Sequence, residues 1–235
     1  RQVKHFKIPY AFSEVMKIEK LGDEHFVVHT KEGDYESKMV IWAAGTIAKQ
    51  IEAEGEEEYV GRGISYCAIC DGSFHEKQNV VVIGGGNSAI EEALYLAKIC
   101  KKVTIITRGH HFRADPVLME KVMRANNVDL VTHHVITKFT GKDLLEQVTA
   151  KDRDSDNEIV LNVRGAFIYV GFTPSSTLLE NFDILDEDKY IIVDRNCETK
   201  VTGLYAAGDC IQKNIRQIAT AVAGITCASA IVRKI

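Results

Sequence analysis

The pattern of apolar and polar positions changes character near residue 79. Before that point, three segments rich in Val, Ile and aromatic residues cover 11–19, 25–30 and 36–44, with Gly-Asp pairs at 22–23 and 33–34. Short apolar segments bounded by such turn residues predict a β-meander. A run of glutamates follows, Glu52, Glu54, Glu56, Glu57 and Glu58, and its charge predicts a solvated linker.

From residue 79 onward, strands and helices are expected to alternate. A continuous apolar run at 80–83 predicts a buried strand, and apolar residues at three- and four-residue spacing predict a helix over 88–100. A second strand is expected at 103–106 and a third at 128–132. Between them, the capping carboxylate Asp115 before Pro116 predicts a helix to about residue 125. This β-α-β-α-β order is one mononucleotide-binding half.

The rest of the chain returns to short β segments. They are expected within 135–170, at 190–193 and at 203–207, before an apolar helix over about 217–232. We therefore predict an α/β fold of two domains. One domain, residues 47–170, is inserted into a discontinuous domain made of residues 1–46 and 171–235.

Charge and composition exclude several function classes. The 235 residues carry 29 Lys and Arg against 33 Asp and Glu, a formal net charge of −4, so no basic excess exists to hold a nucleic-acid backbone. The most apolar long stretch, 219–232, is too short to span a bilayer, and no export signal is visible in the first residues. We expect a cytoplasmic protein without nucleic-acid or membrane partners.

A glycine-rich loop lies between the first strand and helix of the alternating region. Gly84, Gly85, Gly86, Asn87, Ser88 and Ala89 fit the pattern G-x-G-x-x-A. Glycines let the backbone approach a pyrophosphate, and the helix N-terminus supplies free N–H groups. The loop predicts a dinucleotide site, and the alternative is a tight strand–helix turn without a ligand.

Cations follow the second strand, where a carboxylate is usual in NAD sites. The strand ends in Arg108, and Arg113 follows. A guanidinium suits a 2′-phosphate, so NADPH is favoured over NADH, with ordinary surface arginines as the alternative. His110 and His111 can add charge nearby, although loop histidines are commonly only solvated.

Six cysteines are too few for a secreted disulfide scaffold of this length, but two of them form a C-x-x-C pair. Cys67 and Cys70 can form and open a small disulfide ring, a helix N-terminus would lower the thiolate pKa, and Asp71 can shuttle a proton. The alternative, half a zinc site with His75, lacks a second ligand pair, so we expect no metal. The remaining cysteines, Cys100, Cys197, Cys210 and Cys227, are expected to be small core or surface residues.

A strand running into Ala-Gly-Asp places Gly208 and Asp209 at a strand end, where the carboxylate suits a ribityl hydroxyl. Together with the motifs at 43–46, 67–72, 84–93, 112–114 and 216–220, this order resembles the low-molecular-weight thioredoxin reductases over essentially the whole chain. The resemblance implies a Rossmann-like NAD(P)H domain inserted into a partial FAD-binding domain. It also implies a homodimer in which NADPH reduces FAD, the flavin reduces the cysteine pair, and the pair reduces thioredoxin.

The resemblance also implies roles for individual residues. Cys70 would face the flavin, Cys67 would attack thioredoxin and Asp71 would be the acid. Residues beyond the glycine loop and the arginines are also expected to bind cofactor, with Gly208 and Asp209 at the ribityl-pyrophosphate part and the last four by the flavin ring. They are Gly45, Gly171, Gly208, Asp209, Arg216, Gln217, Ile218 and Ala219.

Two departures from the family leave more than one function open. No G-x-G-x-x-G loop for the ADP half of FAD precedes residue 43, so we expect a fragment that starts partway through the flavin domain. Gly109 stands where NADPH-using members carry a further arginine, so ferredoxin or reduced flavin is an alternative donor. The motifs also fit the flavoprotein component of an alkyl hydroperoxide reductase, or a nucleotide-binding module that senses redox state without catalysis.

Overall fold

The computed structural model describes residues 5–224, 229 and 231. The chain forms two compact units: unit 1 combines Arg1–Ile47 with Phe172–Ile235, and unit 2 is Ala48–Gly171. The α/β class predicted from the alternating pattern is confirmed. Among the helices of the described residues, none has both the length and the apolar character needed to cross a membrane.

Unit 1 is built from short strands. An antiparallel sheet has the order β1-β2-β3, β4 pairs in parallel with β15, and β5 shares a two-stranded sheet with β14. The strands are β1 (Val15–Gly22), β2 (His25–Thr30), β3 (Gly33–Ser37), β4 (Val40–Trp42), β5 (Thr46–Ala48), β14 (Phe172–Pro174) and β15 (Leu204–Ala206). The helical segments are η2 (Thr177–Phe182), η3 (Gly208–Cys210) and α6 (Ile218–Val222).

Three expectations for unit 1 need correction. The single strand expected over 36–44 is two strands, because the chain leaves β3 and continues as β4 in another sheet. The segment 190–193 is not a strand; Ile191 makes only isolated bridges to Leu185 and Ile211. The helix expected over 217–232 begins as α6, and much of its second half lies outside the described residues.

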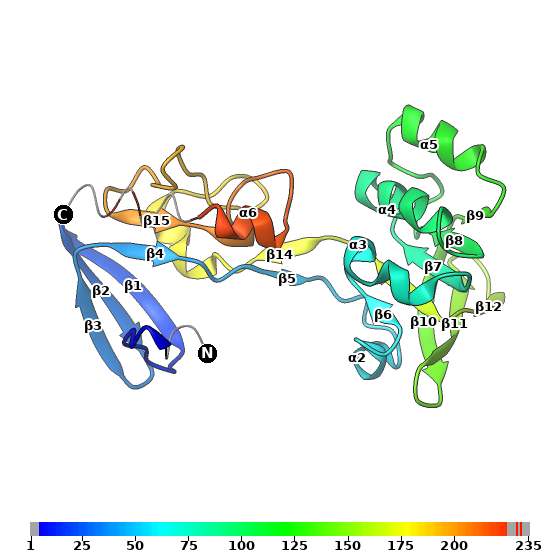
Figure 1. The fold of residues 1–235 in the computed structure, drawn as a ribbon, viewed down its shortest axis with the longest axis horizontal. Coiled ribbons are helices and arrows are strands. Elements are labelled where there is room, and N and C mark those ends of the chain that lie inside the picture. The colour runs from blue at the N-terminus through cyan, green and yellow to red at the C-terminus, as the bar shows by residue number, and fades with distance from the viewer. Residues whose placement is uncertain (1–4, 225–228, 230, 232–235) are drawn as a thin grey trace. The chain divides into compact units, whose positions relative to one another are not determined.

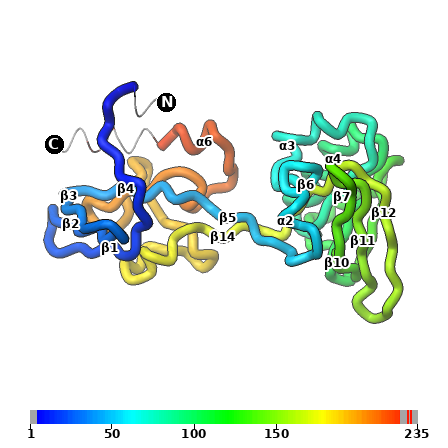
Figure 2. Tube along the Cα trace, turned by 90° about the horizontal axis from the view of Figure 1, so that it is seen from below, coloured from blue at the N-terminus to red at the C-terminus, as the bar shows by residue number. Residues whose placement is uncertain are grey.

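Unit 2 contains a five-stranded parallel sheet in the order β6-β13-β7-β8-β9 and an antiparallel sheet in the order β10-β11-β12, whose strands run side by side in Figure 2. The strands are β6 (Ile64–Ser65), β7 (Asn79–Ile83), β8 (Lys102–Ile106), β9 (Val128–Val131), β10 (His134–Gly141), β11 (Leu145–Asp152), β12 (Glu158–Asn162) and β13 (Gly165–Ile168). The helical segments are α2 (Glu56–Tyr59), α3 (Ala68–Asp71), η1 (Gly72–His75), α4 (Asn87–Ala97) and α5 (Pro116–Met123).

The continuous apolar run of β7 is explained by two cores, one on each face of the parallel sheet. Val81 and Ile83 pack with the antiparallel sheet, whereas Val80 and Val82 pack with α4 and α5. Figure 1 shows these helices and the strands β10, β11 and β12 around the parallel sheet. Side chains alternate between the faces of a strand, so a strand covered on both sides must be apolar at every position. The carboxyl end of this buried strand leads directly into the glycine loop.

The glutamate run is solvated, as its charge suggests, at four of its five positions, and Glu56 is the exception. Glu56 is 3% exposed, and its carboxylate accepts hydrogen bonds from the backbone N–H of Ile51 at 3.0 Å and of Glu52 at 2.9 Å, and from the Tyr66 hydroxyl at 3.3 Å. The inward carboxylate therefore ties the turn before α2 to the strand that leads to the cysteine pair.

We expect Glu56→Ala to lower the free energy of unfolding by about 2–4 kcal/mol, because two buried amides and a phenol lose a charged acceptor. Thermal unfolding of the variant measures the loss. Glu57→Ala, at the exposed neighbour, is the matched control and leaves the midpoint almost unchanged. Equal midpoints for the two variants would contradict the structural role of Glu56.

Candidate active site

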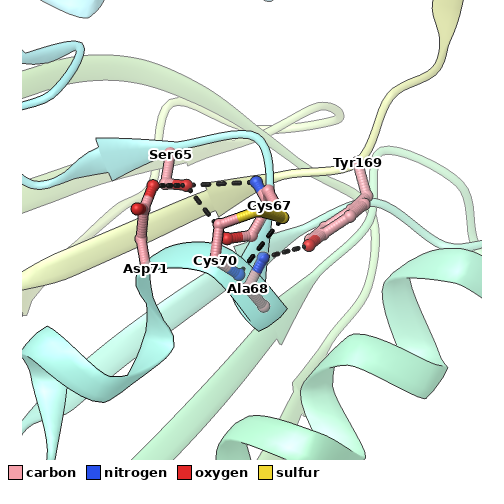
Figure 3. Close-up of a disulfide and its surroundings, with 6 residues drawn as sticks. All are labelled: Ser65, Cys67, Ala68, Cys70, Asp71 and Tyr169. Atoms are coloured by element: carbon pink, nitrogen blue, oxygen red, sulfur yellow. Dashed lines mark hydrogen bonds between the residues drawn. A yellow bond between two sulfur atoms is a disulfide. The ribbon is translucent and has the colours of Figure 1, made fainter. Parts of the chain in front are cut away.

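Cys67 and Cys70 form a disulfide at the start of α3, with their Cα atoms 5.3 Å apart (Figure 3). Cys67 is the N-cap residue in an extended conformation, and its Sγ accepts a hydrogen bond from the Cys70 N–H at 3.2 Å. Because α3 is one turn long, the three-residue spacing places Cys70 one turn after Cys67, and their sulfurs meet at the N-terminal end of the helix. The first-turn N–H groups that face Cys67 favour a thiolate there.

Ser65 holds the acid candidate beside the disulfide. Its hydroxyl donates to Asp71 Oδ2 at 2.6 Å and accepts from the Cys67 N–H at 3.0 Å (Figure 3). Ser65 is 7% exposed, at the end of β6, where the chain turns toward α3. Sequence reasoning missed this serine, because nothing in the C-x-x-C-D pattern points to a residue two positions upstream.

The zinc alternative for this site is not what the structure builds. The two sulfurs are joined to each other. The His75 ring packs edge-on against the Phe167 ring, with centroids 5.5 Å apart, and against Gly165. Burial lowers the pKa of His75. This histidine is therefore a packing residue between η1 and the parallel sheet.

Tyr169 reaches the same helix from the end of β13. Its hydroxyl accepts a hydrogen bond from the Ala68 N–H at 2.6 Å (Figure 3). Burial is the main cause of a raised pKa at Tyr169, and the nearby Glu92 carboxylate adds to it. Burial and then Glu91 raise the pKa of Glu92, while a hydrogen bond with Tyr169 lowers it. Sequence reasoning missed both residues.

The glycine loop has room for a ligand at one position only. A Cβ on Gly84, whose φ is +150°, would lie 2.5 Å from the Tyr169 carbonyl oxygen, and one on Gly85 would lie 2.5 Å from Thr107 Oγ1. At Gly86, the N-cap of α4, a Cβ would meet nothing within 4 Å. Gly84 and Gly85 therefore pack the loop against the sheet, and Gly86 leaves its backbone open, as a pyrophosphate at the helix N-terminus requires.

The residues after Gly86 begin the helix. Asn87 and Ser88 are exposed and Ala89 is buried. Asp115 is expected to cap α5, but its side chain makes no capping hydrogen bond. Its carboxylate instead accepts a hydrogen bond from Asn87 Nδ2 at 3.0 Å, and its N–H donates to Asn87 Oδ1 at 2.8 Å. The expected cap is therefore a link between the loop before α5 and the glycine loop.

The structure brings one candidate arginine directly to the glycine loop. The Arg113 N–H donates to the Gly85 carbonyl at 2.6 Å, and both Arg113 and Arg108 have exposed side chains. Arg153, from the β11–β12 hairpin, donates through Nη1 to the Arg108 carbonyl at 3.2 Å. Sequence reasoning missed Arg153, which adds a third exposed cation to this group.

Two histidines, His110 and His133, form a cluster with Asp154. The His110 and His133 rings stack with centroids 3.8 Å apart and an angle of 12°, and His133 Nε2 lies 2.8 Å from Asp154 Oδ2. Their possible ligand atoms lie within 4.8 Å of one another. Ring nitrogen lone pairs lie in the ring planes, so nearly parallel rings do not aim them at one point. The cluster is a stack with a carboxylate beside it, and His111 is an exposed loop residue.

In unit 1, the parallel pairing of β4 with β15 places two glycines at the same edge. Gly45 follows β4 and Gly208 follows β15, both in the left-handed region with φ of +71° and +84°, and a Cβ at either would meet nothing within 4 Å. Asp209 Oδ1 lies 3.1 Å from Lys213 Nζ. This open backbone with a carboxylate fits a sugar-like or phosphate part of a cofactor.

Arg216 and the start of α6 lie in the same unit. The Arg216 guanidinium stacks on the Tyr190 ring at 4.1 Å and donates through Nε to the Asp209 carbonyl at 3.4 Å. Gln217 is the N-cap of α6 in a capping box with Thr220, so Ile218 and Ala219 form its first turn. Gly171, with φ of +109°, belongs to unit 2, where its carbonyl accepts the Lys49 N–H.

Three of the remaining cysteines are buried: Cys100, Cys197 and Cys210. Burial raises the pKa of the Cys100 thiol to about 11, so it stays protonated at neutral pH. Their expected role as core residues agrees with this burial, and Cys227 lies outside the described residues.

Comparison with known proteins identifies the family. A profile of the pyridine nucleotide-disulphide oxidoreductases matches residues 5–224. The thioredoxin reductase of Bacillus subtilis (strain 168) is 38% identical over 221 residues, which are 93% of this chain and 69% of that protein. The chain belongs to the thioredoxin reductase family.

A solved structure and a second curated relative agree with this family. The crystal structure of thioredoxin reductase from Streptococcus pyogenes MGAS5005 has a TM-score of 0.91 at 35% identity, and it covers 99% of this chain and 76% of that one. A bifunctional thioredoxin reductase/thioredoxin of Mycobacterium leprae (strain TN) is 37% identical over 206 residues, 87% of this chain and 45% of that protein. The resemblance stated from the motifs alone is therefore confirmed.

Proposed function

We propose that the chain carries the disulfide-reducing centre of a thioredoxin-disulfide reductase, which moves electrons from NADPH through FAD and the Cys67–Cys70 disulfide to thioredoxin. The observation that carries the proposal is the disulfide at the start of α3, in the same unit as the open glycine loop. When bound, the flavin supplies two-electron transfer between NADPH and the disulfide.

The cysteine pair and Asp71 would divide the work. Two electrons break the S–S bond and leave two sulfurs, one as thiolate and one as thiol once a proton is delivered. Asp71, held by Ser65, is the proposed acid. Cys67 would then attack a thioredoxin disulfide, and Cys70, the proposed flavin-facing sulfur, would resolve the mixed disulfide and restore the oxidised pair.

The two units would hold different cofactors. In unit 2, the glycine loop from Gly84 through Ala89 would hold the NADPH pyrophosphate, with Arg108 and Arg113 at the 2′-phosphate. Gly45, Gly208, Asp209 and residues 216–219 of unit 1 would hold FAD. Gly171, at the end of unit 2, would line a cofactor site as well. Open backbone at Gly45, Gly86 and Gly208 supports these assignments.

The thioredoxin partner is supported by surface chemistry around the disulfide. Ile69 and Phe74, beside the cysteines in α3 and η1, are 59% and 76% exposed. Exposed apolar side chains around a reactive group are typical of a protein-docking surface. A homodimer and a cytoplasmic location stay predictions, and sedimentation equilibrium of the intact protein tests the first.

A visible spectrum before and after NADPH tests the proposed function. The intact protein is expected to be yellow, to bleach with NADPH and to recover colour when oxidised thioredoxin is added. Insulin reduction coupled through thioredoxin measures turnover. Bleaching without transfer to thioredoxin would point to another disulfide acceptor, and no bleaching would reject NADPH as the donor.

The arginines offer a separate prediction on cofactor choice. We expect Arg108→Ala with Arg113→Ala to raise the KM for NADPH strongly and to leave the KM for NADH nearly unchanged. Each charge-assisted contact contributes about 1.5–3 kcal/mol, or roughly tenfold or more in affinity. Steady-state kinetics with both cofactors measures the change. Equal losses for NADPH and NADH would reject the phosphate role.

A further inference from the structure

Tyr169 is one of the side chains that hold the redox helix α3 in unit 2. Ala68, the first residue of α3, is fully buried, so its N–H needs an acceptor inside the protein. The Tyr169 hydroxyl is that acceptor at 2.6 Å, across 101 residues of chain (Figure 3). The Tyr169 backbone is fixed as well, because its N–H donates to the Ile83 carbonyl at 2.7 Å.

A phenol that accepts this hydrogen bond still has its own proton to donate. Glu92, on α4, acts electrostatically on the phenol, and its buried Oε2 has no hydrogen-bond partner among the described residues. The other charged groups that act on this pair are Glu91 on α4 and Asp71 on α3, and Asp71 in turn acts electrostatically on His75 of η1. Carboxylates thus dominate the charged surroundings of the phenol, and the hydrogen bond from the Ala68 N–H connects the phenol to the Cys67 turn.

The Tyr169 phenol and the Glu92 carboxyl oppose the stabilisation of a Cys67 thiolate by the N-terminus of α3. First-turn N–H groups stabilise a thiolate at the N-cap, and the Cys70 N–H already points at Cys67 Sγ. Tyr169 takes up the Ala68 N–H, so that donor is not offered to sulfur. A carboxyl group behind the phenol further disfavours negative charge at Cys67.

We propose that Tyr169, backed by Glu92, is a positioning residue for the disulfide that keeps Cys67 less acidic than the start of α3 would otherwise make it. The inference rests on the proposed function, in which Cys67 is the attacking thiol. The intrinsic nucleophilicity of a thiolate falls with its pKa, and the best attacking thiol has a pKa near the ambient pH. A Cys67 thiol whose pKa is kept near the ambient pH therefore attacks thioredoxin faster than a strongly acidic thiol would.

The test measures the pKa of Cys67 from the pH profile of its alkylation by iodoacetamide in a Cys70→Ser background, with peptide mass spectrometry to separate Cys67 from the remaining cysteines. We expect Tyr169→Phe and Glu92→Gln each to lower this pKa, by about one unit for Tyr169→Phe. Tenfold more thiolate, offset by its weaker nucleophilicity, gives alkylation about threefold faster well below the pKa. Because the tyrosine transmits the effect of Glu92, the double variant is expected to shift no further than Tyr169→Phe alone.

Tyr66→Phe is the matched control, because Tyr66 precedes Cys67 but its hydroxyl donates to Glu56; it is expected to leave the Cys67 pKa unchanged. An unchanged or raised pKa in folded Tyr169→Phe overturns the proposal. If that variant does not fold, Glu92→Gln decides alone: a lowered pKa supports the proposal and an unchanged one overturns it. Alkylation needs neither cofactor nor thioredoxin, so failure of the proposed function, read from insulin reduction with Cys70 intact, is a separate result.

Discussion

Replacing either Cys67 or Cys70 with serine is expected to lower NADPH-driven thioredoxin reduction by at least about 10³-fold. A single sulfur cannot form the internal disulfide that accepts two electrons, and loss of a group that works as a unit with its partner removes nearly the whole effect. Insulin reduction coupled through thioredoxin measures the loss. NADPH oxidation by oxygen or by a free quinone needs no disulfide and should persist.

Cys100→Ala is the control for general damage by cysteine replacement. Cys100 is buried, free and protonated at neutral pH, so its removal is expected to cost some stability and no chemistry. If Cys67→Ser or Cys70→Ser kept activity close to that of Cys100→Ala, the assignment of the redox pair would be wrong.

The second large effect is expected at the glycine loop, where alanine at Gly84 and alanine at Gly86 should have different consequences. Gly84→Ala forces a side chain into a left-handed backbone position and against the Tyr169 carbonyl at 2.5 Å. We expect the free energy of unfolding to fall by about 2–4 kcal/mol from strain and overpacking together. Thermal unfolding detects this loss, and binding of NADPH is lost with the loop geometry.

Gly86→Ala is expected to leave the unfolding midpoint within about 1 kcal/mol of wild type, because a Cβ there touches nothing and φ is −98°. Its methyl group would instead occupy the space proposed for the pyrophosphate, so calorimetry should show weaker NADPH binding. Wild-type NADPH affinity in Gly86→Ala would show that the cofactor does not lie against this residue. Wild-type stability in Gly84→Ala would show that the loop can move away from β13.

The parallel sheet of unit 2 could be predicted because its central strand is apolar on both faces. Val80 to Ile83 serve two cores at once, and this leaves a continuous apolar run that a one-sided strand lacks. The cysteine pair could be predicted for a similar local reason, since spacing within one helical turn places both sulfurs together. Patterns of this kind lie within a few consecutive residues.

Features that depend on distant residues left no local pattern. Glu56 belongs to a run of five glutamates, and it differs from exposed Glu57 by its hydrogen bonds from the preceding turn and from the Tyr66 hydroxyl, ten residues away. Tyr169 follows an ordinary buried strand, and its contact with Ala68 spans 101 residues. Asp115 sits in an ideal capping position, yet Asn87 offers it both a donor and an acceptor. Tertiary partners decided each case.

The pairing of β4 with β15 has a consequence for biosynthesis. Val40 lies opposite Leu204, so the first strand of this parallel pair leaves the ribosome more than 160 residues before its partner. At roughly 5–20 residues per second, that interval is about 8–32 s. Unit 2 lies wholly within it and has every one of its own strands available first. β1, β2 and β3 can pair with one another at once, but β4 must wait without its partner strand, exposed to aggregation or chaperone capture, until the last third of the chain is made.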